Sequence, residues 1–342
     1  MEARYFGSAN SYNGFYSLFG EIFSRKKFER TFILKGGPGT GKSTFMKKVA
    51  KLAEVHGAVV EYYYCSSDIN SLDGVIIELN GKKFAIIDGT APHENDAVYV
   101  GAADEIVNLG DGIDYDWIRQ YREKIISLSD QKSAAYKNAY SYLKVAGECD
   151  KCICKAKMRS FDSKTAGKYI CNLRDLIACE EKDKEERKFI SSFSKNAYRS
   201  FDLDAEEIIK INGNRKEAIL LISYINENLR CGFKEVFSTP LNIQYADALR
   251  FNKKVAIIYD ADEGEQNATI YFDQSPSATE NVRVMLNIYN DSMDEAVRWF
   301  GIASDIHFRL EEIYQKCMDF DRNEEKIVEI GKKILKLCDC ES

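Results

Sequence analysis

The sequence contains few residues that interrupt regular structure and few imidazoles. Of its 342 residues, four are proline and three are histidine, and the histidines His56, His93 and His307 are far apart. The 45% of hydrophobic residues and 12% of aromatic residues are not the composition of a disordered chain. We therefore expect a globular protein that is long enough for two domains of ordinary size.

Positive charge is in deficit. The 48 Lys and Arg residues are outnumbered by 54 Asp and Glu residues, which gives a formal net charge of −6. General nucleic-acid binders present a basic face that neutralises phosphates. Nucleic acid is therefore a disfavoured partner.

Long apolar runs are also missing. No stretch approaches the roughly 20 apolar residues that a membrane-spanning helix requires. The first residues, MEARYF, show no basic segment followed by an apolar one, as a secretory signal would. We expect no membrane association and a cytoplasmic location.

Ten cysteines are spread along the chain, and only two groups of them are close in sequence. The groups are Cys149, Cys152 and Cys154, and Cys338 and Cys340. Cys149 and Cys152 would share one face of a helix and could hold a metal or form a redox pair. No second close pair of Cys or His residues accompanies them, so the pattern favours free thiols over a metal site.

A six-residue block occurs twice. KKFAII at residues 82–87 and KKVAII at residues 253–258 share five of their six residues. Upstream of each block, a helix-like stretch ends at a glycine, Gly57 or Gly232, and a strand-like run follows. The pattern predicts an α/β fold of two tandem units, each a mainly parallel sheet flanked by helices, although convergent hydrophobic patterning could mimic such a repeat.

The charged run EEKDKEERK at residues 180–188 separates the two copies and predicts a linker or a solvated helix end. We expect one domain at residues 1–185 and a second at residues 186–342. Each domain is expected to carry a helical hairpin, at about residues 114–154 and 281–314.

Residues 36–44, GGPGTGKST, match the phosphate-binding pattern G-x-x-x-x-G-K-[ST] at every fixed position. A short apolar run at residues 31–35 precedes them and an amphipathic run at residues 45–53 follows, which predicts strand, loop and helix. Glycines let consecutive N–H groups converge on a phosphate, and the helix N-terminus adds its dipole. The residues predicted to bind nucleotide are Gly36, Gly37, Pro38, Gly39, Thr40, Gly41, Lys42, Ser43 and Thr44.

Two of these side chains have specific predicted roles. Lys42 is expected to reach the β- and γ-phosphate oxygens of ATP, and the Ser43 hydroxyl to bind Mg²⁺. A second Mg²⁺ ligand is predicted at Asp88, which ends the apolar run 84–87 in the manner of a Walker B strand. Lys42 and Asp88 are therefore predicted to be catalytic.

The general base is harder to predict. Gly89 follows Asp88, so the Asp-Glu pair with which many motor-type ATPases activate water is missing. Asp68, His93 and Glu94 are the candidates, because each would lie at the carboxyl edge of a parallel sheet. Of these, Asp68 is predicted to be the catalytic residue. The competing interpretation is that Asp68 only stabilises a turn.

Other side chains are weaker candidates. Arg119 and Arg122 could approach the γ-phosphate from a lid, although arginines on a surface helix are commoner. The aromatic residues before the first strand of the loop motif could stack on the base, but core packing is the favoured interpretation. These aromatic residues are Phe15, Tyr16 and Phe19.

The second half lacks a comparable loop. Aligning INGNRKEA at residues 211–218 with residues 36–43 puts Glu217 opposite Lys42 and Ala218 opposite Ser43. Shifting the alignment by one residue supplies Lys216, but Glu217 then replaces the serine. Asp260 and Asp262 follow the second KKVAII strand. We expect a degenerate second unit with a structural or regulatory role, and one nucleotide per chain.

Several segments together resemble a known family. They are YF at residues 5–6 with GFYSLF at 14–19, the loop 36–44, CSSD at 65–68 with SLDGVII at 71–77, DGTAPH at 88–93 and DEIVNLG at 104–110. The chain resembles bacterial ATP-binding proteins built from two tandem P-loop NTPase-like halves, described as ATPases or as nucleotide-kinase-like. The resemblance covers most of the chain and implies ATP binding, but it leaves the reaction open. The degenerate second loop departs from the family, in which the second half often looks like another P-loop.

The sequence thus predicts a Mg²⁺-dependent ATPase or phosphotransferase that acts in the first half, on an unknown small-molecule acceptor or with a protein partner. One alternative is a small-molecule or nucleotide kinase, since residues 65–68 could help hold an acceptor. Another is a non-catalytic ATP sensor whose second half reports occupancy to a partner.

Overall fold

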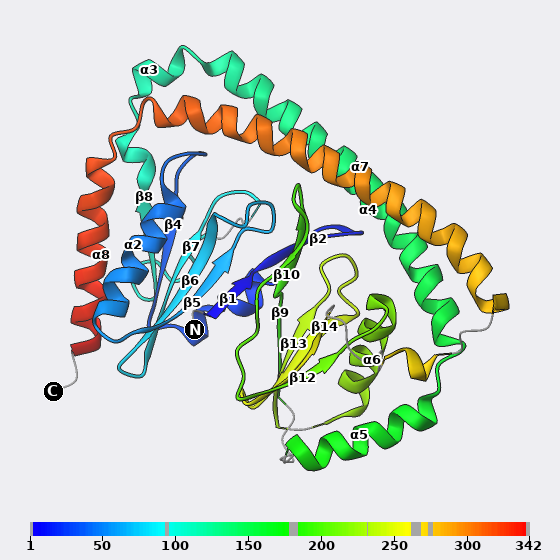
Figure 1. The fold of residues 1–342 in the computed structure, drawn as a ribbon. Helices are drawn as coiled ribbons and strands as arrows, with labels where there is room; N and C mark the ends of the chain where they lie inside the picture. Colours follow the sequence, from blue (N-terminus) through cyan, green and yellow to red (C-terminus); the bar gives the residue numbers. More distant parts are fainter. Residues whose placement is uncertain are drawn as a thin grey trace. The chain divides into compact units, whose positions relative to one another are not determined.

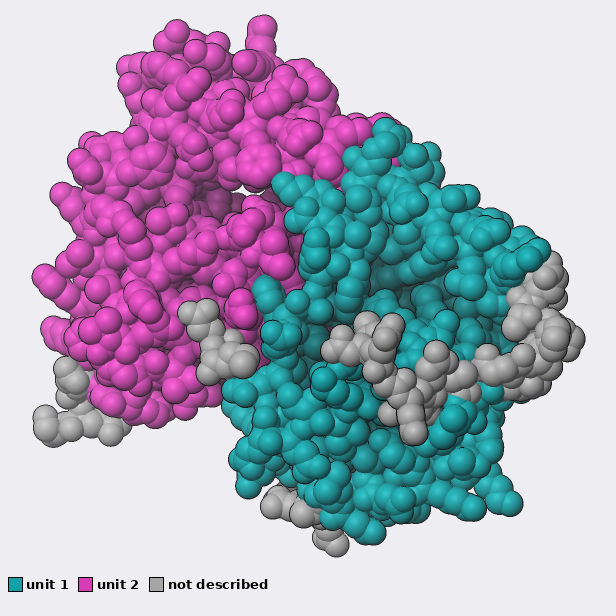
Figure 2. All heavy atoms as spheres, viewed as in Figure 1, with its two compact units in different colours: residues 1, 9–16, 138–298 teal, residues 2–8, 17–137, 299–342 magenta. Residues whose placement is uncertain are grey.

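The computed structural model describes residues 3–92, 96–177, 184–230, 232–260, 268–272 and 276–339. The chain forms two compact units (Figure 2). Unit 2 comprises residues 2–8, 17–137 and 299–342, and unit 1 comprises residues 1, 9–16 and 138–298. The units differ from the predicted division at residue 185, because two long helices each contribute residues to both units. In the part of the chain that is described, no helix combines the length and apolar character needed to cross a bilayer.

Unit 2 is built on a six-stranded sheet with the order β1-β5-β6-β7-β4-β8 (Figure 1). Its strands are β1 (Ala3–Phe6), β4 (Arg30–Lys35), β5 (Val59–Tyr64), β6 (Leu72–Leu79), β7 (Lys82–Asp88) and β8 (Asp104–Asn108). The other neighbours are parallel, but β6 is antiparallel to both β5 and β7. The sheet is therefore mixed, which corrects the prediction of a mainly parallel sheet. The cause is a two-residue turn between β6 and β7, in which Asn80 and Gly81 both have positive φ, as tight hairpins require.

Helix α2 (Lys42–Val55) packs on this sheet because its apolar residues recur at helical spacing. It buries Phe45, Met46, Val49, Ala50 and Ala53. Helix α8 (Asp321–Asp339) joins the same core through Ile327, Ile330 and Ile334 and lies beside α2 (Figure 1). Short elements complete the first part of the chain: α1 (Phe19–Ile22), η1 (Arg25–Lys27), η2 (Leu109–Gly112) and α3 (Tyr115–Arg119).

Unit 1 is built on a five-stranded sheet with the order β12-β15-β14-β13-β9. Its strands are β9 (Lys184–Lys188), β12 (Glu207–Ile211), β13 (Phe233–Ser238), β14 (Ala246–Phe251) and β15 (Val255–Tyr259). Helix α6 (Arg215–Asn228) follows β12, as α2 follows β4. Read from the other edge, β9-β13-β14-β15-β12 has the same strand order and directions as β1-β5-β6-β7-β4. The two KK-x-AII blocks lie at β7 and β15, in matching places.

The charged run that was predicted to be a linker is partly a strand. Residues 184–188 form β9, which pairs in parallel with β13 at the edge of the sheet. Charged side chains suit an edge strand because they discourage pairing with other chains. Residues 180–183 lie outside the described residues.

In sequence, a small hairpin follows β1 and another follows β9: β2 (Ser8–Ser11) with β3 (Gly14–Ser17), and β10 (Ser191–Ser194) with β11 (Ala197–Ser200). Residues 9–16 of the first hairpin belong to unit 1. Gly14 and Ala197 open the second strand of each hairpin with positive φ, 100° and 57°. Of the aromatic residues proposed for stacking, Phe19 is buried in the core and Tyr16 packs edge-on against Phe189. Phe15 is half-buried on β3.

The predicted helical hairpins are instead single long helices, α4 (Arg122–Met158) and α7 (Pro276–Gln315). Neither contains a proline after its first turn, so no local signal ends the helix. In unit 2, Leu128 of α4 packs with Ile306, Leu310 and Ile313 of α7. Helix α5 (Ser163–Ile177) and the short η3 (Thr269–Tyr271) complete the described elements.

Candidate functional site

The predicted phosphate-binding loop, residues 36–41, connects β4 to α2 in unit 2. Gly39 and Gly41 have φ values of 70° and 88°, in the left-handed region that glycine adopts without strain. The Thr40 hydroxyl donates to the Gly37 carbonyl oxygen at 2.9 Å and ties the loop together. Gly41 is the N-cap of α2, and no side chain within the described residues caps the helix there. The first N–H groups of the helix are thus kept for another acceptor.

Lys42 is the first residue of α2 and is largely buried, with 12% of its side chain exposed. Its Nζ donates to the carbonyl oxygens of Gly36 and Gly37 at 2.9 and 3.0 Å. The same Nζ lies 3.7 Å from Asp88 Oδ2. The structure therefore brings the predicted lysine and the predicted Walker B aspartate together.

Asp88 is the last residue of β7 and is held by Thr90, whose N–H and hydroxyl donate to its Oδ1 at 2.8 and 2.6 Å. Burial raises the pKa of Asp88, and the neighbouring carboxylate of Asp73 adds to the rise. Lys42 and Thr90 act in the opposite direction.

Ser43 and Asp73 lie at the same edge of the sheet. The Ser43 hydroxyl accepts a hydrogen bond at 2.9 Å from the N–H of Leu72, the residue before Asp73. Asp73 is buried, with 5% exposure. The sequence prediction did not include Asp73 among the candidate site residues, although an acid inside the apolar run 72–77 was a signal. Asp247 occupies the same position of β14. The described residues contain no group of three or more His, Cys, Asp or Glu side chains that could hold a metal.

Asp68 lies in the turn between β5 and β6, where it accepts hydrogen bonds from its own turn. Its Oδ1 accepts from the Asn70 N–H and its carbonyl from the Ser71 N–H, both at 3.0 Å. Tyr136 of α4 is close by, and burial raises the pKa of its phenol to about 12. His93 and Glu94, the other candidate bases, lie outside the described residues.

A cavity of about 470 Å³ adjoins the loop at Gly36 and Gly37. Arg119 and Arg122 line it, so these arginines lie beside the predicted phosphate site. Two tyrosines, four isoleucines and two further residues complete the lining: Tyr115, Tyr314, Ile113, Ile118, Ile125, Ile126, Asn108 and Gly110. Strands β7 and β8 flank β4 on opposite sides. The lining of the cavity includes Asn108 at the end of β8, whereas Asp88 at the end of β7 is not part of it.

Unit 1 has a different structure at the matching helix N-terminus. Only residues 212–214 separate β12 from α6, where residues 36–41 separate β4 from α2. Asn214 caps α6 by accepting a hydrogen bond from the Lys216 N–H. Arg215 is the first residue of α6, as Lys42 is of α2, which corrects the alignment that placed Glu217 opposite Lys42. Glu217 is instead buried and pairs with Lys157 Nζ at 2.6 Å.

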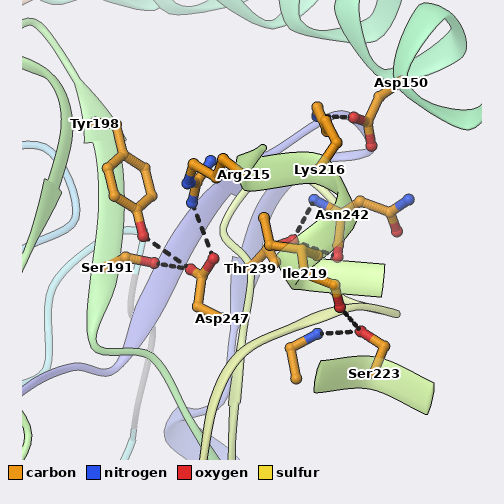
Figure 3. A network of polar contacts seen from close by, with 11 residues as sticks. Asp150, Ser191, Tyr198, Arg215, Lys216, Ile219, Ser223, Thr239, Asn242 and Asp247 are labelled. Carbon is orange, nitrogen blue, oxygen red and sulfur yellow. Dashed lines mark hydrogen bonds and ion pairs between the residues drawn. The ribbon is translucent and has the colours of Figure 1, made fainter. Parts of the chain in front are cut away.

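The two cations at this end of α6 are paired with carboxylates (Figure 3). Arg215 lies 2.9 Å from Asp247 Oδ1, and Lys216 forms an ion pair with Asp150. Asp247 also accepts hydrogen bonds from the hydroxyls of Ser191 and Tyr198. A cavity of about 70 Å³ remains among these groups.

The acidic residues after the second KK-x-AII block and the clustered cysteines were also singled out in the sequence. Asp260 pairs with Lys210 Nζ at 2.6 Å, and Asp262 lies outside the described residues. Cys149 and Cys154 are buried whereas Cys152 is exposed, and burial raises the pKa of the Cys154 thiol to about 12. Cys338 is buried in unit 2, and Cys340 lies outside the described residues.

No family model, curated protein or solved structure matches this chain. A role for residues 36–44 therefore rests on the sequence pattern and on the geometry of the loop. That geometry joins a glycine-rich turn, a helix N-terminus that no described side chain caps, a lysine and a pair of carboxylates.

Proposed function

We propose that unit 2 binds a nucleoside triphosphate, most simply ATP, together with Mg²⁺. The observation that carries the proposal is the loop itself. Two glycines in the left-handed conformation turn the chain directly before a 14-residue helix that begins with Lys42. Such a turn aims N–H groups and the positive end of the helix dipole at one place, which suits a phosphate.

The roles of the side chains follow from their positions. When a nucleotide binds, the Lys42 ammonium would leave the carbonyl oxygens of Gly36 and Gly37 and donate hydrogen bonds to phosphate oxygens instead. Ser43 and Asp88 would hold Mg²⁺, with Asp73 beside them. A bound Mg²⁺ ion would neutralise charge that develops on the phosphates during transfer. Serine and carboxylate oxygens are ligands that Mg²⁺ accepts, and phosphate and water would supply the rest of its shell.

The cavity beside Gly36 and Gly37 is suited to the nucleoside. Its lining includes the end of β8 and not Asp88, and its tyrosines and isoleucines offer apolar surface to a base. Arg119 and Arg122 would then contact the sugar or the phosphate nearest to it. The other side of the loop, near Asp68, is left for water or an acceptor.

Hydrolysis or phosphoryl transfer is the proposed reaction, and the cytoplasm, where ATP is abundant, the proposed location. A small-molecule or nucleotide kinase and a non-catalytic ATP sensor remain the alternatives. Phosphate release without an acceptor indicates an ATPase, and ADP formation that requires an acceptor indicates a kinase. Binding without turnover indicates a sensor.

We further propose that the units are tandem copies of one P-loop NTPase-like fold, with unit 1 degenerate. The matching strand order, the matching hairpins and the KK-x-AII blocks support this proposal. The resemblance to tandem bacterial ATP-binding proteins agrees with it. Arg215 and Lys216 are held by carboxylates, so we propose that unit 1 binds no nucleotide.

The test compares two lysines of α2. Lys42→Ala should weaken ATP binding by about 1.5 to 3 kcal/mol, roughly 10- to 150-fold, because it removes charge-assisted bonds to phosphate. Lys51→Ala is the control, since Lys51 is exposed and pairs with Glu54 on the same helix. Titration calorimetry measures both affinities. Equal affinities in the two variants would show that the loop does not bind the phosphates.

A further inference from the structure

The last turns of α7 lie against the glycine loop of unit 2. A Cβ atom built on Gly39 would lie 2.8 Å from the Glu311 carbonyl oxygen, and one built on Gly37 would lie 2.7 Å from the Tyr314 ring. The amide of Asn323, at the start of α8, donates to the Thr40 carbonyl oxygen at 2.9 Å. The glycines of the loop are therefore required for the approach of α7 as well as for the turn.

This approach brings a carboxylate into the loop. The Glu311 side chain is half-buried, and both the Lys42 ammonium and the Gly39 N–H stabilise its carboxylate. His307, one turn earlier on α7, lies with its Nε2 3.5 Å from Glu311 Oε1. The neighbouring His307 and then the Lys42 ammonium lower the pKa of the Glu311 carboxyl despite partial burial. Glu311 is thus an anion at the loop.

A second cation faces the same place from α4. Lys132 is half-buried, and its pKa is lowered by burial and by the nearby Lys42. Glu311 acts on Lys132 in the opposite direction. The titratable groups around Glu311 are therefore Lys42, Lys132 and His307. Together with the Gly39 N–H, these are groups that would otherwise attract phosphate.

We propose that Glu311 is an internal competitor for the phosphate site and acts in this way as a gate to nucleotide binding. Its carboxylate competes with a phosphate of the nucleotide for the Gly39 N–H and for the positive charge of Lys42. Nucleotide binding therefore has to displace the Glu311 side chain. The gate rests on the proposed nucleotide binding by unit 2. It lowers the affinity for ATP and makes nucleotide release easier, because the loop regains an anion as the phosphate leaves.

The experiment uses the full-length chain and two neighbouring glutamates. Glu311→Gln keeps the size of the side chain and removes its charge, whereas Glu312→Gln makes the same change at an exposed residue of the same turn. ATP affinity is measured by titration calorimetry with Mg²⁺ present. Glu311→Gln should bind ATP roughly 5- to 50-fold more tightly than the natural chain. Glu312→Gln should bind with unchanged affinity.

Other outcomes overturn the gate in distinguishable ways. If both variants bind as the natural chain does, or Glu311→Gln binds more weakly, Glu311 is not a competitor. If Glu311→Gln leaves affinity unchanged and lowers kcat, Glu311 assists the reaction as a base instead. If none of the three proteins binds ATP, the proposed function itself fails. Glu311→Ala, which removes the whole carboxylate, provides a second variant should the glutamine variant misfold, and the gate predicts tighter ATP binding for it too.

Discussion

The N-termini of α2 in unit 2 and α6 in unit 1 follow matching strands but differ in their caps and in the partners of their cations. In unit 2, α2 begins after a six-residue glycine loop, no side chain among the described residues caps it, and Lys42 is bonded to loop carbonyls. In unit 1, α6 begins after three residues, Asn214 caps it, and Arg215 and Lys216 each have a buried carboxylate. The comparison shows that one strand order can support a helix start that no described side chain caps, where we propose anion binding, or a closed ion-pair network. Loop length and the placement of a few charges decide which is formed.

Asp73 and Asp247 make the comparison specific, since each is the second residue of the central antiparallel strand. In unit 1 the carboxylate of Asp247 binds the cation at the helix start. In unit 2 the carboxylate of Asp73 lies beside Asp88 and near Ser43, and Lys42 points into its own loop. The same acid is therefore proposed to stabilise the fold in one unit and to serve a metal in the other.

The largest expected effect comes from Asp247→Ala. The change leaves Arg215 without its ion pair and removes the acceptor of Ser191 and Tyr198. We expect a loss of about 3 kcal/mol in the free energy of unfolding, at the lower end for a broken buried pair because Arg215 is 32% exposed and can regain water. Urea unfolding measures the loss. ATP affinity, measured where the variant is folded, should be unchanged.

Asp73→Ala is the matched variant in unit 2 and should do the reverse, lowering Mg²⁺-ATP affinity more than stability. If Asp247→Ala instead weakens ATP binding as much as Asp73→Ala does, the two aspartates have the same role. The contrast between the units would then be wrong.

Asp88→Asn is expected to have a smaller effect than Asp247→Ala. The amide keeps the shape of the side chain but is a poorer ligand for Mg²⁺. ATP affinity with Mg²⁺ present should fall by about tenfold, or about 1.4 kcal/mol, and affinity without metal should change little. Calorimetry with Mg²⁺ and with a chelator separates the two. Equal losses under both conditions would identify Asp88 as a structural residue.

Much of the candidate site in unit 2 was predictable from local sequence. The pattern 36–44, the apolar run before it and the amphipathic run after it determine β4, the loop and α2, because turn chemistry and hydrophobic spacing act over few residues. The same holds for Asp88 at the end of β7. The repeated block KK-x-AII indicated matching strands, and both copies form one.

Other features depend on contacts that sequence spacing does not reveal. Glu311 follows the loop by more than 260 residues, and only the packing of α7 on Gly37 and Gly39 brings it there. The two long helices were predicted as hairpins because a helical pattern does not say where a helix turns back. The strand β9 carries a charged side chain at each of its five positions, and its pairing with β13 overrides its low propensity for a strand. Asp73 becomes a site residue only when β6 is placed beside β7.

The smallest predicted effect comes from Tyr198→Phe, which sharpens the account of unit 1. The change removes one hydrogen bond, from the Tyr198 hydroxyl to Asp247 Oδ2 at 3.1 Å, and keeps the ring that stacks with Arg215. We expect a loss of about 1 kcal/mol in the free energy of unfolding, with ATP affinity unchanged. Urea unfolding is again the measurement. A loss as large as that of Asp247→Ala would mean that the hydroxyl, and not the ion pair, holds the network.

The number of nucleotides bound per chain tests the central claim most directly. Equilibrium dialysis of the full-length protein with Mg²⁺-ATP, extended to concentrations well above the dissociation constant, counts every site. The account predicts one nucleotide per chain, and about half a nucleotide or less for Lys42→Ala at roughly ten times the natural dissociation constant, where the natural chain is almost saturated. Arg215→Ala should still bind one. Two nucleotides per natural chain, or one that persists in Lys42→Ala and disappears in Arg215→Ala, would contradict it.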